Sequence, residues 1–295
     1  MALKIPSADG EINKYNLSRS SVGTPRIYYV NGIRVLGRDH AVTAALLSLL
    51  TERPIWGVHN RTAGTVSGLL FDVGQSGLDY LQNASARFGS KGLTPDKKIP
   101  NHEIPKLVDE IIKKSVIWNK ATAALFKSVM LNRNSMQMIV AHSQGNLVTS
   151  NALFVVEKVL GSAALQKVRV YSLASPSPGW PLGLRVTNGG GGRQENAFMN
   201  DLVALLRPHN LAAKVGVKRF QNAGDFRTHK PSGAVSLAPH DTNLNIALNF
   251  LKSIRNDLGL SPNLSDDFLA KANERAQAAI PKGERSWLQK LDDMF

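Results

Sequence analysis

The sequence predicts an α/β fold with a mostly parallel sheet and helices on both faces of that sheet. From about residue 25 the chain alternates short β-branched or aromatic segments with longer segments whose apolar residues recur at helical spacing. This alternation is typical of a parallel sheet, because each helix returns the chain to the edge where the next strand begins. The 295 residues, 43% of them hydrophobic, are also enough to build one large domain with a full core.

The predicted elements follow one another along the chain in a regular order. Each strand is a short apolar run, and each helix is a longer segment with an apolar face. Asp39 stands where it would cap the first of these helices. We expect strands at 26–32, 53–60, 135–143, 167–176, 183–188 and 217–224, and helices at 39–52, 67–88, 100–132, 144–160 and 240–259.

The chain is expected to form one domain, at residues 25–260, with additions at both ends and in the middle. Residues 1–24 are predicted to be an N-terminal extension, and residues 261–295 a helical C-terminal tail. Residues 66–133 are predicted to form a basic helical insertion that would serve as a cap or lid. Four consecutive glycines at 189–192 indicate a flexible loop, because such a run does not fit inside a helix or strand.

The formal net charge is +14, and its distribution is uneven. Between residues 91 and 133 there are nine lysines and arginines against four acidic residues. Such a charge concentrates anionic partners, whether lipid, nucleic acid or acidic protein, although a solvated surface that aids solubility explains it equally well. The absence of cysteine excludes a disulfide scaffold, a thiol nucleophile and a cysteine-ligated metal.

The N-terminal residues contain no apolar run of signal-peptide length, and no segment approaches the ~18 apolar residues of a membrane-spanning helix. We therefore expect a soluble protein made in the cytoplasm without a signal peptide. Export would then require a specialised secretion route.

The stretch MQMIVAHSQGNLV, residues 136–148, predicts a nucleophile elbow. An elbow needs a buried strand, a tight turn that carries the nucleophile, and a helix that starts directly afterwards. Ser143 lies at the bend, with the small residues Ala141 and Gly145 on either side where the strand and helix backbones come close. The start of the following helix would favour negative charge beside Ser143. We predict that Ser143 is a nucleophile, although a serine that merely starts a helix would look similar.

A serine nucleophile needs a general base, and in this architecture the base follows the serine in the chain. Of the seven histidines, His209, His229 and His240 come after Ser143. His209 and His229 lie among basic residues, which would lower the proton affinity of a base. His240 stands in a loop directly before a strongly helical segment, so it is the predicted base.

The acid that orients the base is expected between Ser143 and His240. Asp201 lies in AFMNDLVALLRP, a short apolar strand that runs into a turn, and its carboxylate would emerge beside the serine loop, so it is the first candidate. Asp225 also follows a predicted strand and stays open as the alternative.

Two backbone N–H groups are needed to bind the oxyanion of a tetrahedral intermediate. One is predicted at Gln144, directly after the nucleophile, and the other at Gly32 or Ile33, in the loop after the first predicted strand. The side chain of Asn31 would orient that loop, and Asn31 and His142 are also candidate substrate contacts. The alternative is that Asn31 and Gly32 form only a turn.

From about Pro25 to Gly259 the chain resembles the α/β-hydrolase superfamily. The resemblance rests on VNGI, AHSQGN, ASPSP, MNDLVALLRP and PHDTN. It implies an α/β-hydrolase-type sheet and a triad of Ser143, Asp201 and His240 in the chain order of the superfamily. NDLVALLRP is similar to the acid loop of lipase-like members, and the H-S-Q-G core is similar to that of lipase-like effectors that bacteria inject through secretion machines.

These observations predict a serine ester hydrolase that acts on lipid or phospholipid carboxylic esters, with no metal and no cofactor. Thioesterase, acyltransferase or peptidase activity would use the same triad. A non-catalytic module that binds an acidic partner or nucleic acid is the alternative from another class. Nucleic acid is not expected, since the chain lacks the basic and aromatic interleaving of a nucleic-acid platform.

A lipid substrate is suggested by the basic region at 91–133 and its apolar residues. An amphipathic segment of this kind could lie at an anionic membrane surface or form a lid. A core-packed helix with lysines on its outer side explains the same pattern. The apolar residues are Val116, Ile117, Trp118, Leu125 and Phe126.

Overall fold

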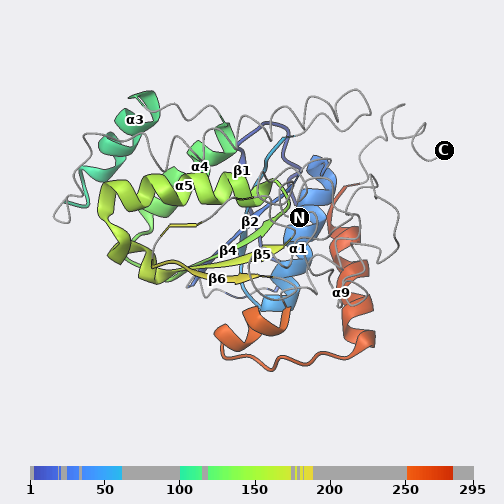
Figure 1. Ribbon diagram of the computed structural model, residues 1–295. Coiled ribbons are helices and arrows are strands. Elements are labelled where there is room, and N and C mark those ends of the chain that lie inside the picture. The colour runs from blue at the N-terminus through green and yellow to red at the C-terminus, as the bar shows by residue number, and fades with distance from the viewer. Residues whose placement is uncertain are drawn as a thin grey trace, which may run out of the picture.

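The computed structural model describes residues 3–18, 20, 25–32, 35–61, 100–114, 119–173, 177, 180–181, 183–188 and 251–281. Within these residues six strands form one sheet in the order β1-β3-β2-β4-β5-β6 (Figure 1). The four neighbouring pairs from β3 to β6 are parallel, and β1 pairs antiparallel with β3. The strands are β1 (Ile12–Tyr15), β2 (Arg26–Val30), β3 (Ile55–Val58), β4 (Gln137–His142), β5 (Val168–Leu173) and β6 (Arg185–Asn188).

Helices cover both faces of this sheet (Figure 1). On one face α1 (Gly37–Thr51) and α9 (Asp266–Ala279) share a core cluster with the helical residues 251–257. On the other face α3 (Ile104–Lys114), α4 (Lys120–Leu131) and α5 (Gly145–Leu160) form a second cluster, beside the 3₁₀ helix η1 (Ser162–Lys167). The predicted mostly parallel sheet with helices on both faces is therefore confirmed.

Alternation along the strands divides their side chains between the two clusters. Ile27 and Tyr29 of β2 pack with α1, whereas Tyr28 and Val30 pack with α4 and α5. This follows from the two-residue period of a strand, which sends successive side chains to opposite faces. Both faces of the central strands are buried, as expected of a parallel sheet that helices cover on both sides.

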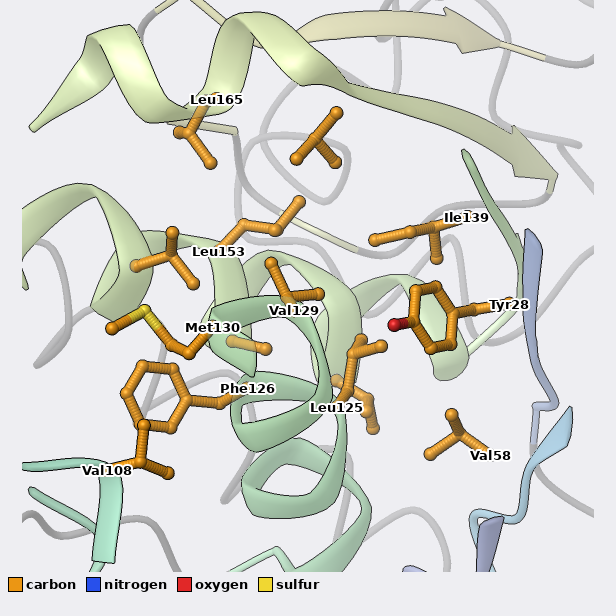
Figure 2. Packing of buried hydrophobic residues seen from close by; sticks show 14 of the residues in the cluster. Tyr28, Val58, Val108, Leu125, Phe126, Val129, Met130, Ile139, Leu153 and Leu165 are labelled. Atoms are coloured by element: carbon orange, nitrogen blue, oxygen red, sulfur yellow. The ribbon is translucent and has the colours of Figure 1, made fainter. Parts of the chain in front are cut away.

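The helix α4 belongs to the core of the protein. Leu125 and Phe126 are fully buried in the second cluster. Figure 2 shows Tyr28 of β2 and Ile139 of β4 on the side of the sheet that faces α4. The burial of these residues supports the alternative that residues 120–131 form a core-packed helix, and it does not support an amphipathic segment that lies at a membrane surface. Residues 116–118, which include Trp118, lie outside the described residues.

Two details differ from the sequence-based expectation. The predicted helix at 100–132 is two helices, and Asn119 caps the second by accepting a hydrogen bond from the Thr122 N–H at 2.9 Å. Asp39 was wrongly expected to cap α1, because the helix begins at Gly37 and Asp39 lies inside its first turn. A carboxylate in that turn still interacts favourably with the helix dipole.

Both ends of the chain contribute to the body that the sequence placed at residues 25–260. Residues 12–15, expected within an N-terminal extension, form β1 at the edge of the sheet. From the expected tail, Ala272 and Ala276 of α9 are buried in the cluster that contains α1. The predicted strand at 217–224 lies outside the described residues, as does the predicted helix at 67–88.

Two histidines lie side by side inside the protein. His40 of α1 is fully buried, and its ring centroid lies 5.1 Å from that of Tyr29 and 5.2 Å from that of His59. Gly57 makes room for this ring, since a Cβ on Gly57 would overlap Nε2 of His40. Burial lowers the pKa of His40 well below 6.5, the neighbouring His59 lowers it further, and burial also lowers the pKa of His59.

This pair should make the protein less stable in mild acid. As the pH falls below about 6.5, the unfolded chain binds protons that the folded protein does not, so each histidine removes up to about 1.4 kcal/mol of unfolding free energy per pH unit. Urea unfolding between pH 7.5 and 5 should show this decline, and the slope should be smaller in His40→Leu. A flat profile, or equal slopes for the two proteins, would contradict this explanation.

Candidate active site

Ser143 sits in a sharp turn between the central strand β4 and the helix α5. Its φ is 52°, in the left-handed region. Glu52, at φ 54°, is the other non-glycine residue in this region among those described, and it caps the C-terminus of α1. A left-handed φ costs a residue with a Cβ about 1–2 kcal/mol. Such strain persists only where the surroundings enforce it, and it often marks functional sites.

Two glycines let the chain pack tightly around this turn. A Cβ on Gly32 would lie 2.5 Å from the Cβ of Ser143 and 3.2 Å from its Oγ. A Cβ on Gly145 would overlap the carbonyl oxygen of Val30, the last residue of β2. The loop after β2 therefore lies directly against the serine, as expected for Gly32.

The start of α5 is built around the carbonyl group of Ser143. That carbonyl accepts hydrogen bonds from the backbone N–H of Asn146 at 2.9 Å and from its side-chain Nδ2 at 3.0 Å. The 16-residue helix that follows presents the positive end of its dipole to the turn. Negative charge that develops beside Ser143 would therefore be stabilised.

Buried carboxamides join the ends of three strands at this turn. The Asn31 Nδ2 donates to the carbonyl oxygens of Gly32 at 3.0 Å and of Asn60 at 2.7 Å, while the Asn60 N–H donates to Asn31 Oδ1 at 2.9 Å. The Asn60 Nδ2 donates to Gln144 Oε1 at 2.8 Å, and the Asn119 Nδ2 approaches Asn60 Oδ1 at 3.4 Å. The Asn31 side chain thus connects the loop after β2 with the residue that follows β3 by two positions, and its predicted contact with substrate stays a prediction.

The Ser143 side chain is fully buried, and none of the described residues forms a hydrogen bond with its Oγ. His142, the last residue of β4, is also fully buried. A buried hydroxyl without a partner is uncommon and calls for an explanation. The predicted triad and oxyanion residues Asp201, His240 and Ile33, and the alternative acid Asp225, lie outside the described residues, so these assignments stay predictions.

Asn60 and Asn119 were not anticipated as neighbours of the site. Asn60 lies two residues after β3, and the carboxyl ends of parallel strands meet at one edge of a sheet, where ligands bind in α/β proteins. A polar residue at the end of a predicted strand was therefore the signal that could have found it. Asn119 had no such signal, because it belongs to a helix start.

Comparison of the chain with protein-family models, with curated proteins and with solved structures finds no significant match. Within the part of the chain that the structure describes, none of the helices has the length and apolar character needed to cross a membrane. The same residues include no group of three or more histidine, cysteine or acidic side chains placed to hold a metal ion.

The backbone strain at Ser143 should be visible in the stability of two variants. Glycine relieves a left-handed φ and alanine does not, so Ser143→Gly should be more stable than Ser143→Ala by about 0.5–1 kcal/mol in urea unfolding. Ser150 is a buried serine inside α5 and provides the matched control. There the order should reverse, with glycine about 1 kcal/mol less stable than alanine. The same order at both positions would show that Ser143 is not strained.

Proposed function

We propose that the protein is a serine ester hydrolase of the α/β-hydrolase type. The observation that carries this proposal is the left-handed Ser143, placed between the central parallel strand and the N-terminus of α5. A nucleophile elbow combines these features: a strained turn raises the serine hydroxyl at the carboxyl end of the sheet, directly before a helix.

The neighbouring strand supports the same proposal. In an α/β-hydrolase, one oxyanion donor comes from the residue after the nucleophile and the other from a strand-to-helix loop beside it. Here Gln144 follows Ser143, and the loop that contains Gly32 connects β2, which pairs with β4, to α1. The close approach of Gly32 to Ser143 is what a shared oxyanion site requires.

The proposed reaction has two steps. Ser143 Oγ attacks the carbonyl carbon of a carboxylic ester while His240, oriented by Asp201, takes its proton. The N–H groups of Gln144 and of Gly32 or Ile33 bind the oxyanion, and the alcohol leaves with the proton from His240. Water, deprotonated by His240, then attacks the acyl-enzyme, which releases the carboxylic acid and returns the proton to Ser143.

A lipid or phospholipid ester is the proposed substrate, in keeping with the resemblance to lipase-like hydrolases. The high positive charge of the chain supports an anionic membrane surface as the place of action. The burial of Leu125 and Phe126 in the core means that α4 itself would not supply the apolar contact with such a surface.

Replacement of Ser143 should abolish the hydrolysis of short acyl esters while the fold stays intact. Ser143→Ala removes the nucleophile, and loss of a triad serine lowers kcat by about 10⁶-fold in comparable enzymes. Ser172, a buried serine of β5 that pairs with Ala141, provides the matched control. We expect Ser172→Ala to hydrolyse p-nitrophenyl butyrate at the wild-type rate. A purified wild-type protein without activity on any short ester would overturn the proposal.

Phospholipid vesicles distinguish a lipid substrate from soluble esters and thioesters. The protein should release fatty acid from phospholipid vesicles, more rapidly from anionic than from neutral ones, and added salt should weaken this preference because it screens surface charge. Hydrolysis of soluble esters and thioesters without release of fatty acid would contradict the lipid substrate but not the serine mechanism.

A further inference from the structure

We infer that Asn60 is a positioning residue, which holds Gln144 and the loop after β2 in the geometry needed to bind an oxyanion. This inference rests on the proposed function and adds to it a residue that follows β3, a strand that does not pair with the nucleophile strand β4. In the sheet, β2 lies between β3 and β4. The Asn60 side chain therefore reaches past the end of β2 to contact the residue after Ser143.

The backbone of Asn60 is itself fixed on the neighbouring strand. Its N–H donates to Asn31 Oδ1 at 2.9 Å, and its carbonyl oxygen accepts from Asn31 Nδ2 at 2.7 Å. Asn31 and Asn60 are 0% and 2% exposed, so water does not compete for these bonds. A pair of bonds between the same two residues fixes their relative orientation more firmly than one bond would.

The side chain of Gln144 is held by Asn60, whereas its carbonyl oxygen accepts from the N–H groups of Leu147 and Val148 in α5. Gln144 occupies the cap position of α5 with φ −55° and ψ −27°, and its side chain makes no capping hydrogen bond to that helix. Instead its Oε1 accepts from Asn60 Nδ2 at 2.8 Å, and Gln144 is 1% exposed. Loss of this bond would take a hydrogen bond from a buried amide oxygen, which is costly, and the side chain would be held less firmly.

The same cluster fixes the other side of the proposed oxyanion site. Asn31 Nδ2 donates to the Gly32 carbonyl oxygen at 3.0 Å as well as to Asn60. One set of carboxamides thus connects Gln144 after β4 with Gly32 after β2. Preorganised donors stabilise a transition state because they need no reorganisation when the charge develops. Asn60 joins the two sides, so it acts through other residues and does not itself need to contact the substrate.

The test compares Asn60→Ala with a control that removes an equally buried carboxamide elsewhere. Gln137 is fully buried at the opposite end of β4, where its Nε2 donates to the Val129 carbonyl oxygen at 3.2 Å. Gln137→Ala should therefore lower stability without changing kcat below the melting temperature. Asn60→Ala should lower kcat about 10–100-fold and change KM less than about twofold, because an oxyanion donor acts mainly in the transition state.

A double variant shows whether Asn60 acts through Gln144. Gln144→Ala removes the side chain that Asn60 holds, so adding Asn60→Ala to it should lower kcat by less than about twofold. If Asn60→Ala changes kcat no more than Gln137→Ala does, or if the two effects multiply, the inference is wrong and the proposed function still stands.

Hydrogen exchange gives a result that does not depend on activity. Amide exchange in the segment 143–147 should be faster in Asn60→Ala than in the wild type, and unchanged there in Gln137→Ala. If the wild type hydrolyses no ester, the proposed function fails, and this comparison still decides whether Asn60 holds the turn. Equal exchange of this segment in both variants would overturn the positioning role.

Discussion

The close approach of the chain after β2 to the turn after β4 is the constraint on which the rest of the site depends. Neither Gly32 nor Gly145 has room for a Cβ, and Ser143 between them adopts a left-handed φ of 52°. Since β2 and β4 are parallel and in register from Arg26 and Gln137 onward, their carboxyl ends arrive at the same level. The loop after one strand and the serine after the other are therefore placed together by the sheet itself.

The surrounding structure compensates for the free energy that this geometry costs. The strained backbone of Ser143 and the burial of several carboxamides both oppose folding. A strained residue costs about 1–3 kcal/mol, and a buried polar group left without a hydrogen bond costs about the same. The two apolar clusters on either face of the sheet provide the opposing stability. The buried side-chain amides of Asn31, Asn60 and Gln144 at the carboxyl end form hydrogen bonds with one another and with neighbouring backbone groups, which explains why asparagine and glutamine occur there together.

Local patterns in the sequence predict the described strands β2 to β6 and the position of Ser143, because strand periodicity and an elbow depend on residues close in sequence. They miss β1, whose sequence INKY contains little apolar alternation and forms a strand only by pairing with β3. They also miss the contact of Asn60 with Gln144, which depends on the order of strands in space and not on spacing along the chain. Asp201 and His240 were chosen by chain order and by their local sequence context, and they stay predictions.

The most direct test of the account is to identify the serine that reacts with a fluorophosphonate. Such a reagent phosphonylates a serine that a base activates and an oxyanion site accommodates, so it reports both at once. After digestion and mass spectrometry, we expect a single adduct on the peptide that contains Ser143, at a stoichiometry near one, and no adduct in His240→Ala over the same time. Absence of an adduct in the wild type, or an adduct on another serine, would contradict the assignment of Ser143 as the nucleophile.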